Sequence, residues 1–302
     1  TAVAQTCKVA SGWLEPALAK SKSLAANKVL ADAADRDFVL LGEQHDDPDH
    51  HRWQLQTLAG LYAYRPDMVI GFEMFPRRLQ PVLDRWVEGK LTVREFLTQA
   101  EWEKVWNFPP ELYLPLFEFA RINRIPMVAL NVERSLTKAI GEKGWDSVPV
   151  ADRAGLSRAA PPLPAYRDLL SSIYHEHLPG PRRAAGKPAQ TDKAFEAFVD
   201  AQLTWDRAMA EGLASRAVPG TNGNKPLLVG IMGSGHLRYG HGVPHQLRAL
   251  GFSQIATLLP RSEDMACNDL EPALADAVFN LPLAATAPAQ PPRLGVALED
   301  AA

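Results

Sequence analysis

The sequence predicts an α/β protein with a mainly parallel sheet, helices on both faces of that sheet, and a helical cap or insertion. Short apolar runs of strand length alternate along the chain with longer segments that keep a helical spacing of apolar residues. This alternation is typical of parallel strands joined by right-handed helical crossovers. A chain of 302 residues can bury a full-sized core. We therefore expect a single α/β domain over residues 1–284, with an insertion at about 145–190 and an Ala- and Pro-rich tail at 285–302.

The strands and helices are predicted from local patterns. Residues 1–37 are expected to form a helical lead-in. Five apolar runs after it are expected to be buried strands, at residues 38–41, 68–74, 127–130, 226–232 and 254–259. The first helix opens at Pro48, a residue favoured in a first turn. Thr92 and Glu95 form a capping-box pattern that opens another helix. A long helix is expected over about residues 191–217.

Residues 145–190 differ from the rest of the chain. Prolines make the segment 159–164 stiff, and the segment 180–188 is rich in Gly, Pro, Arg and Lys. Between these two segments lies a helical pattern that runs through Tyr166 to the sequence Tyr-His-Glu-His at 174–177. We interpret this region as a cap over the edge of the sheet and not as another strand–helix unit.

The composition argues against two classes of partner. Hydrophobic residues make up 46% of the chain and charged residues 22%, which is ordinary for a globular domain. The net charge of −3 gives no electrostatic basis for binding nucleic acid or an anionic membrane. No apolar run reaches the roughly 18 residues that a membrane-spanning helix needs. We expect no nucleic-acid partner.

Polar residues follow the apolar strands. Glu43, Glu73, Asn131 and His236 lie at or just past the ends of four strands, and His45 lies close to the first. The carboxyl ends of parallel strands meet at one edge of a sheet, where ligands bind in open α/β folds. We therefore predict a convergent polar pocket. The alternative is that each residue only caps a helix or holds a loop.

Three further residues are assigned to this pocket. Gln202 and Asp206 are four residues apart and fall within or beside the apolar face of the long helix. A carboxylate in such a place needs a partner. Tyr239 belongs to the glycine-rich segment 233–244 that follows a predicted strand.

Glu43, His45, Glu73 and His236 suit two kinds of chemistry. Carboxylates and imidazoles bind zinc or iron, and they also act as general acids and bases without a metal. The spacing does not choose between these because HExxH is absent. The segment 233–236 matches neither GxGxxG, a P-loop, nor GxSxG. A hydrolase that uses this crevice, with or without a metal, is one function that the sequence allows.

The chain contains two cysteines, Cys7 and Cys267. Neither belongs to a CxxC pair, which excludes a zinc knuckle or a thioredoxin motif. A disulfide between them would fit an oxidising compartment. The alternative is two unrelated thiols. We expect an exported protein with this disulfide.

Six segments, in order over about residues 35–280, resemble the ChaN-like haem-binding lipoprotein family. They are LLGEQHDDPDHHRWQLQ at 40–56, FEMF at 72–75, the stretch with Trp102, Trp106 and LYLP, IPMVALN at 125–131, AQLTWDRAMAE at 201–211, and GSGHLRYGHGVP at 233–244. The GExH opening is also similar to a wider set that includes erythromycin esterase and TraB-type proteins, some of which are hydrolases.

The resemblance implies an α/β core with a helical insert and an exported, iron-regulated bacterial protein of haem uptake. Such a protein would be in the cell envelope, periplasmic or associated with the outer membrane, and would work with an outer-membrane haem transport system. The implied cofactor is haem, bound by tyrosine, with two haems held between the subunits of a homodimer. The segment Ala4-Gln5-Thr6 departs from the family because small residues are expected before a lipid-modified cysteine.

The resemblance does not place the tyrosine ligand, which lies outside the matching motifs. We predict that haem binds on the cap, away from the acidic crevice, since carboxylates would repel the haem propionates. Haem needs an apolar slot, an axial ligand and nearby cations. The cap offers Tyr166 for the slot, Tyr174 as the first choice of ligand, His175 and His177 as other ligands, and Arg182 and Arg183 for the propionates. The alternative for this segment is a solvated loop.

Overall fold

A computed structural model describes residues 11–17, 21–177, 192–220, 223–261 and 270–282. Cys7, Cys267, Arg182, Arg183 and the tail at 285–302 lie outside these residues. Within the described ranges, no helix has both the length and the apolar character needed to cross a membrane.

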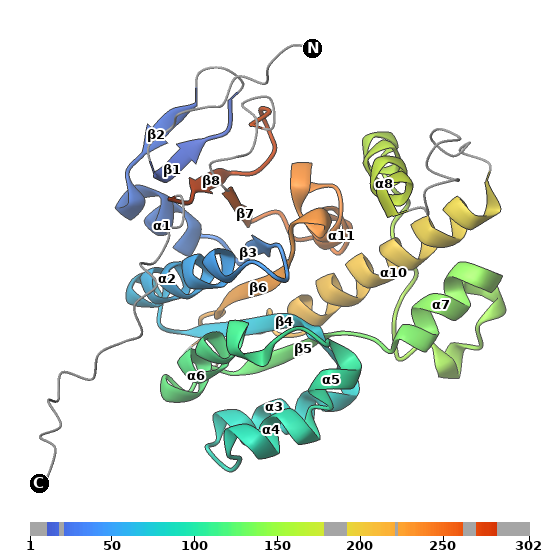
Figure 1. Cartoon of the computed structure of the whole chain (residues 1–302), viewed down its shortest axis with the longest axis horizontal. Helices are drawn as coiled ribbons and strands as arrows, with labels where there is room; N and C mark the ends of the chain where they lie inside the picture. The colour runs from blue at the N-terminus through green and yellow to red at the C-terminus, as the bar shows by residue number, and fades with distance from the viewer. Residues whose placement is uncertain (1–10, 18–20, 178–191, 221–222, 262–269, 283–302) are drawn as a thin grey trace, which may run out of the picture.

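An eight-stranded sheet forms the centre of the molecule (Figure 1). Its strands are β1 (Gly12–Glu15), β2 (Lys22–Leu24), β3 (Phe38–Glu43), β4 (Met68–Pro76), β5 (Met127–Asn131), β6 (Leu227–Gly233), β7 (Ile255–Arg261) and β8 (Ala277–Asn280). Their order across the sheet is β2-β1-β8-β7-β3-β6-β4-β5. The pairs from β8 to β5 are parallel, whereas β1 is antiparallel to both of its neighbours. The predicted mainly parallel α/β fold is confirmed.

Helices cover both faces of the sheet. They are α1 (Ala26–Ala34), α2 (Pro48–Tyr64), α3 (Gln80–Val87), α4 (Val93–Gln99), α5 (Trp102–Val105), α6 (Leu114–Ile122), α7 (Arg134–Lys143), α8 (Pro164–His177), α10 (Lys193–Ala214) and α11 (Val243–Ala249). Val39 and Leu41 of β3 join the apolar cluster formed with α1, α2, α3 and α6. Phe38 and Leu40 join the cluster formed with α10 and α11. Both faces of β3 are therefore buried, as expected for a central parallel strand.

Two helix starts form as predicted. Pro48 is in the first turn of α2, where Asp47 accepts hydrogen bonds from the backbone N–H groups of Asp49 and His50. The capping box of Thr92 and Glu95 opens α4, with both of its reciprocal hydrogen bonds formed.

The helical lead-in predicted for residues 1–37 is wrong for its first part. Trp13 and Leu14 belong to β1, and β2 follows before α1 begins. The short strand β8 was not predicted. Trp13 of β1 pairs with Phe279 of β8. Strands of three or four residues have too little local pattern to be recognised, because they depend on a partner far away in the sequence.

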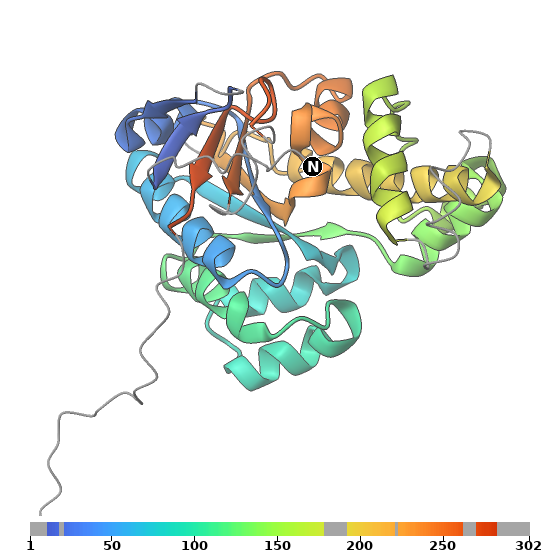
Figure 2. The same ribbon diagram turned by 45° about the horizontal axis from the view of Figure 1, so that its top comes forward.

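The predicted cap contains α8, which lies across the amino-terminal half of α10 on the side of the molecule away from β1 and β2 (Figure 2). The two helices share a small apolar cluster that includes Tyr166, Leu170, Phe195 and Val199. This packing brings the first turn of α8 close to the middle of α10, next to the carboxyl ends of the strands.

Candidate functional site

The carboxyl ends of β3, β4 and β6 bring together the polar residues expected there. Glu43 ends β3 and is paired with Gly233 of β6, and Glu73 lies near the end of β4. His45, Glu73 and His236 line one pocket of about 890 Å³, which we call the crevice pocket. Glu43 is buried beneath it and is hydrogen-bonded to His45.

Two glycines allow these groups to approach the backbone closely. A Cβ on Gly233 would lie 3.1 Å from Cε1 of His45, and a Cβ on Gly242 would lie 2.3 Å from the backbone oxygen of His236. The second contact is shorter than real Cβ atoms make, so a side chain at Gly242 would displace the segment that carries His236.

Glu43 is a fully engaged carboxylate. Its Oε1 accepts hydrogen bonds from the Tyr113 hydroxyl (2.7 Å) and from Nδ1 of His45 (2.8 Å), and its Oε2 accepts one from Nε2 of Gln54 (2.9 Å). Burial raises the pKa of Glu43, but the hydrogen bond from His45 and the nearby charges of His51 and His45 outweigh burial and lower the pKa overall. The carboxyl group is therefore ionised at neutral pH.

His45 has one ring nitrogen held and the other available. Since Glu43 is an acceptor, Nδ1 of His45 carries the proton, and the lone pair of the neutral ring is on Nε2. Within the described ranges no group forms a hydrogen bond with Nε2. Burial lowers the pKa of His45, whereas the hydrogen bond to Glu43 and the charge of Glu73 raise it, and the net shift is upward. The ring lies against Trp106 and Phe108, at centroid distances of 4.6 and 5.4 Å.

His236 lies between two acids. Its Nδ1 is 2.6 Å from Oδ1 of Asp206, and its Nε2 is 3.5 Å from Oε1 of Glu73. Asp206 also accepts a 2.7 Å hydrogen bond from the Tyr166 hydroxyl, and Glu73 accepts one from the backbone N–H of Gly233. Burial lowers the pKa of His236, but the charges of Asp206 and Glu73 raise it to about 9. His236 is therefore an imidazolium at neutral pH.

Aromatic and basic side chains also line the crevice pocket, in addition to the histidines and carboxylates described above. Trp106, Phe108 and Trp205 contribute aromatic surface. Arginine and lysine side chains also line the pocket, and they are Arg78, Lys104, Arg134 and Lys138. Arg78 and Lys104 are paired with Glu101. Arg134 donates a hydrogen bond to the backbone oxygen of Val105.

The other residues assigned to the pocket from the sequence have different positions. Asn131 and Gln202 line it. Asp206 is completely buried behind His236. Tyr239 lies elsewhere, in a smaller pocket with Arg238, and its hydroxyl donates a hydrogen bond to Glu271.

The cap residues are not gathered around an apolar slot in the described ranges. The Tyr166 ring is buried and its hydroxyl is bonded to Asp206, so this residue belongs to the crevice. The Tyr174 ring packs against Phe195 and Phe198, at 5.7 and 5.3 Å. His175 is half-buried on α8. His177 ends α8, and Arg182 and Arg183 lie outside the described residues.

Sequence reasoning missed Tyr113 and Gln54. Tyr113 is next to α6 and is 70 residues from Glu43, so no local pattern connects them. Gln54 is on α2, where its spacing from His51 looks like that of an ordinary helix face. The stretch from Trp102 to LYLP is dense in aromatic residues, but its pattern predicts only a helix through Tyr113 and not a contact with Glu43.

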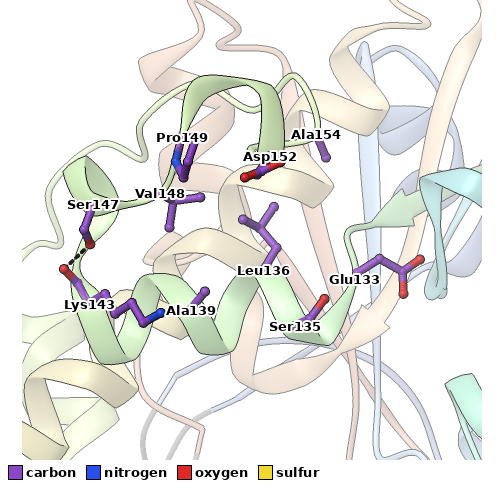
Figure 3. Close-up of a pocket in the computed structure, with 10 residues that line it drawn as sticks. All are labelled: Glu133, Ser135, Leu136, Ala139, Lys143, Ser147, Val148, Pro149, Asp152 and Ala154. Atoms are coloured by element: carbon purple, nitrogen blue, oxygen red, sulfur yellow. Dashed lines mark hydrogen bonds between the residues drawn. The ribbon is translucent and has the colours of Figure 1, made fainter.

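A search for metal-binding clusters and the lining of a second pocket both help to locate the candidate chemistry. Among the described residues, no three His, Cys, Asp or Glu side chains are arranged to hold a metal ion. A second pocket, of about 360 Å³, lies between α7 and the turns at 145–154 (Figure 3). Its lining, which includes Glu133, Ser135, Lys143 and Asp152, contains no histidine. The candidate chemistry is therefore in the crevice.

Comparisons with known proteins agree with this fold. The model of a family described as "Haem-binding uptake, Tiki superfamily, ChaN" matches residues 29–247. A structure of ChaN of Campylobacter jejuni, described as showing cofacial haem binding, has a TM-score of 0.64 and 17% identity, and the match covers 89% of this chain and 96% of that one. A mutant of the erythromycin esterase EreC, in its open conformation, has a TM-score of 0.47 and 10% identity, covering 83% and 77%. A comparison with curated protein sequences finds no significant match.

Proposed function

The chain belongs to the ChaN family of haem-binding uptake proteins in the Tiki superfamily, and from this premise we propose that it binds haem in the crevice pocket. The observation that carries this location is the His45 imidazole. Its Nδ1 is held by the Glu43 carboxylate, and its Nε2 has no partner in the described ranges. Histidines that bind a metal almost always have their other ring nitrogen held in this way. His45 is our candidate for the axial ligand of the haem iron.

The lining of the pocket supports a flat apolar ligand with anionic groups. Its volume of about 890 Å³ is within the usual range for ligand pockets. Trp106, Phe108 and Trp205 would contact the porphyrin ring. Arg134 and Lys138, which are exposed at the rim, would bind the propionates. Bound haem would supply an iron centre that a protein side chain can ligate.

This location differs from the cap site expected from the sequence. That expectation took the crevice residues to be mostly acidic and therefore to repel propionates. Glu43 and Asp206 are buried behind the pocket wall, whereas the pocket is lined by two acids, Glu73 and Glu133, and by four basic side chains, Arg78, Lys104, Arg134 and Lys138. Tyr174 remains the alternative ligand, and a direct comparison of variants distinguishes the two sites.

A haemin titration of the haem-free protein, followed by absorbance, tests the proposal. We expect His45→Ala to change the ferric spectrum and to weaken haem binding. Glu43→Gln should weaken binding by about 10- to 100-fold, because removing the partner of a ligating histidine typically has an effect of this size. Tyr174→Phe should leave both the spectrum and the affinity unchanged.

Three controls accompany this titration. His245→Ala removes a half-buried imidazole outside the crevice pocket, whose Nε2 contacts the backbone oxygen of Pro161, and this variant should bind haemin normally. Tyr166→Phe and His236→Ala test whether the other side of the crevice affects the ligand. A spectrum that changes in Tyr174→Phe and stays the same in His45→Ala would move the site to the cap.

We further propose that the protein acts in haem uptake in the bacterial envelope, as a dimer that holds two haems, together with an outer-membrane haem transport system. The Campylobacter protein is described as binding haem cofacially, and two facing haems fit two open pockets from two copies of one chain. Sedimentation analysis with and without haemin tests the dimer: a monomer that binds one haem would refute it. Fractionation of the source bacterium tests the location.

A further inference from the structure

Several contacts hold His45 in place on the short connection between β3 and α2. Its Nδ1 lies 2.8 Å from Oε1 of Glu43, the last residue of β3. Its backbone oxygen lies 3.1 Å from Nε2 of His51 on α2 and accepts a hydrogen bond from the Tyr113 hydroxyl (3.3 Å). A ligand on a connecting segment needs such contacts, because a binding group must be held within about 0.5 Å of its productive position.

Tyr113 contacts both the backbone of His45 and the carboxylate that holds the His45 ring. The Tyr113 hydroxyl donates a 2.7 Å hydrogen bond to Oε1 of Glu43, the same oxygen that Nδ1 of His45 approaches. The other oxygen of Glu43, Oε2, accepts a 2.9 Å hydrogen bond from Nε2 of Gln54. Because both oxygens are held, the carboxylate cannot rotate without breaking one of these contacts. The position of Oε1 then determines where the His45 ring lies.

The surroundings of Tyr113 fix its own position. The residue is completely buried, and the centroids of its ring and the His51 ring are 4.3 Å apart. Tyr113 follows the turn Pro110–Leu112 and directly precedes α6, whose first turn contains Pro115. Proline fixes the backbone angle φ, so the chain is restricted on both sides of Tyr113. The hydroxyl therefore reaches Glu43 from a stiff segment of the chain.

Tyr113 is not placed to bind iron itself. It is not among the described residues that line the crevice pocket. A tyrosine ligand would have to present its oxygen to the pocket, which would break the 2.7 Å hydrogen bond to Glu43. The same part of the chain supplies the aromatic wall, since the rings of Trp106 and Phe108 lie 4.6 and 5.4 Å from the His45 ring. The position of Tyr113 suits it to orient another side chain.

We propose that Tyr113 is a positioning residue of the haem site: through Oε1 of Glu43 and the backbone of His45, it fixes the His45 ring so that Nε2 is presented to the crevice pocket. This inference rests on the proposed function, which takes His45 as the ligand of the haem iron. Partners of a ligating histidine orient its ring, and replacing them typically lowers metal affinity by about 10- to 100-fold. Tyr113 is one contact further from the iron than Glu43, so we expect an effect at the lower end of this range.

The first test needs no haem. Tyr113→Phe removes the hydroxyl and keeps the ring that packs against His51, and circular dichroism checks that the variant folds. In heteronuclear NMR spectra of the haem-free protein, the His45 ring signals are identified by their loss in His45→Ala, and they should shift and broaden in Tyr113→Phe. The matched control is Tyr62→Phe, which changes a tyrosine of α2 that contacts Phe119 of α6 at 5.9 Å and lies outside the crevice. It should leave these signals unchanged. Unchanged His45 signals in Tyr113→Phe would refute the positioning role.

A haemin titration then connects this contact to the haem site. Tyr113→Phe should change the ferric spectrum in the same way as Glu43→Gln and weaken haem binding by about 10-fold. It should have no further effect in the Glu43→Gln background, because the two groups act through one path. Tyr62→Phe should bind haemin like the wild type.

The outcomes separate this inference from the proposed function. Equal effects of Tyr113→Phe in the wild-type and Glu43→Gln backgrounds would mean that Tyr113 does not act through Glu43, which refutes the inference. Normal haem binding by Tyr113→Phe together with weakened binding by His45→Ala also refutes only the inference. Normal haem binding by His45→Ala refutes the proposed location of the haem, whereas the NMR comparison still decides whether Tyr113 positions the His45 ring.

Discussion

Replacing Asp206 with alanine is expected to lower the free energy of unfolding by about 3–5 kcal/mol at neutral pH, which is the usual cost of removing one partner from a buried ion pair. Asp206 is completely buried on α10, where its two carboxylate oxygens bind His236 at 2.6 Å and Tyr166 at 2.7 Å. Without the carboxylate, the His236 imidazolium loses its nearest counter-charge and the Tyr166 hydroxyl loses its acceptor. Chemical denaturation of the wild type and the variant measures the difference.

A double-mutant cycle shows whether the loss comes from the unpaired charge. Asp206→Ala combined with His236→Ala should be less destabilised than the sum of the two single variants. Asp200→Ala, a change of another aspartate on α10, is the matched control and should change stability by less than about 1 kcal/mol. Burial and Glu196 raise the pKa of Asp200, so its charged form is not favoured by the fold. Additive effects at Asp206 and His236 would contradict the buried pair.

The sequence predicted the centre of the sheet well because buried parallel strands are continuous apolar runs. The run at 38–41 extends to Glu43 in β3, and the run at 226–232 becomes β6, from Leu227 to Gly233. The outer strands of the sheet were harder to predict from the sequence. The strand β1 forms because Trp13 pairs with Phe279 and packs against Trp53, and these contacts join segments that are far apart in the chain.

The candidate site was predictable only where its residues follow strand ends. Glu43, His45, Glu73 and His236 come together because parallel strands share a carboxyl edge. The residues that tune them come from helices, and their roles depend on packing. Tyr166 was expected to line a haem slot on the cap, but its hydroxyl binds Asp206 because α8 packs on α10. Local patterns do not encode such contacts between distant helices.

Stability should also depend on pH through His236. The pKa of this group is about 9 in the folded protein, against an ordinary value of 6.5. Because the folded state binds the proton more tightly, the stabilisation is fully present below about pH 6.5 and is lost as the pH rises through 9. A shift of this size corresponds to about 3 kcal/mol.

The difference in unfolding free energy between the wild type and His236→Gln isolates this contribution. That difference should fall by about 3 kcal/mol between pH 6 and pH 9.5. The lowered pKa of Glu43 does not interfere, since its contribution is lost only as the pH falls into the acidic range. The pKa of Tyr166 is raised well above 10, so its contribution changes only above this pH window. The upward shift of His45 is present in both proteins and largely cancels. A difference that stays constant across the window would mean that His236 is not held as an imidazolium by Asp206 and Glu73.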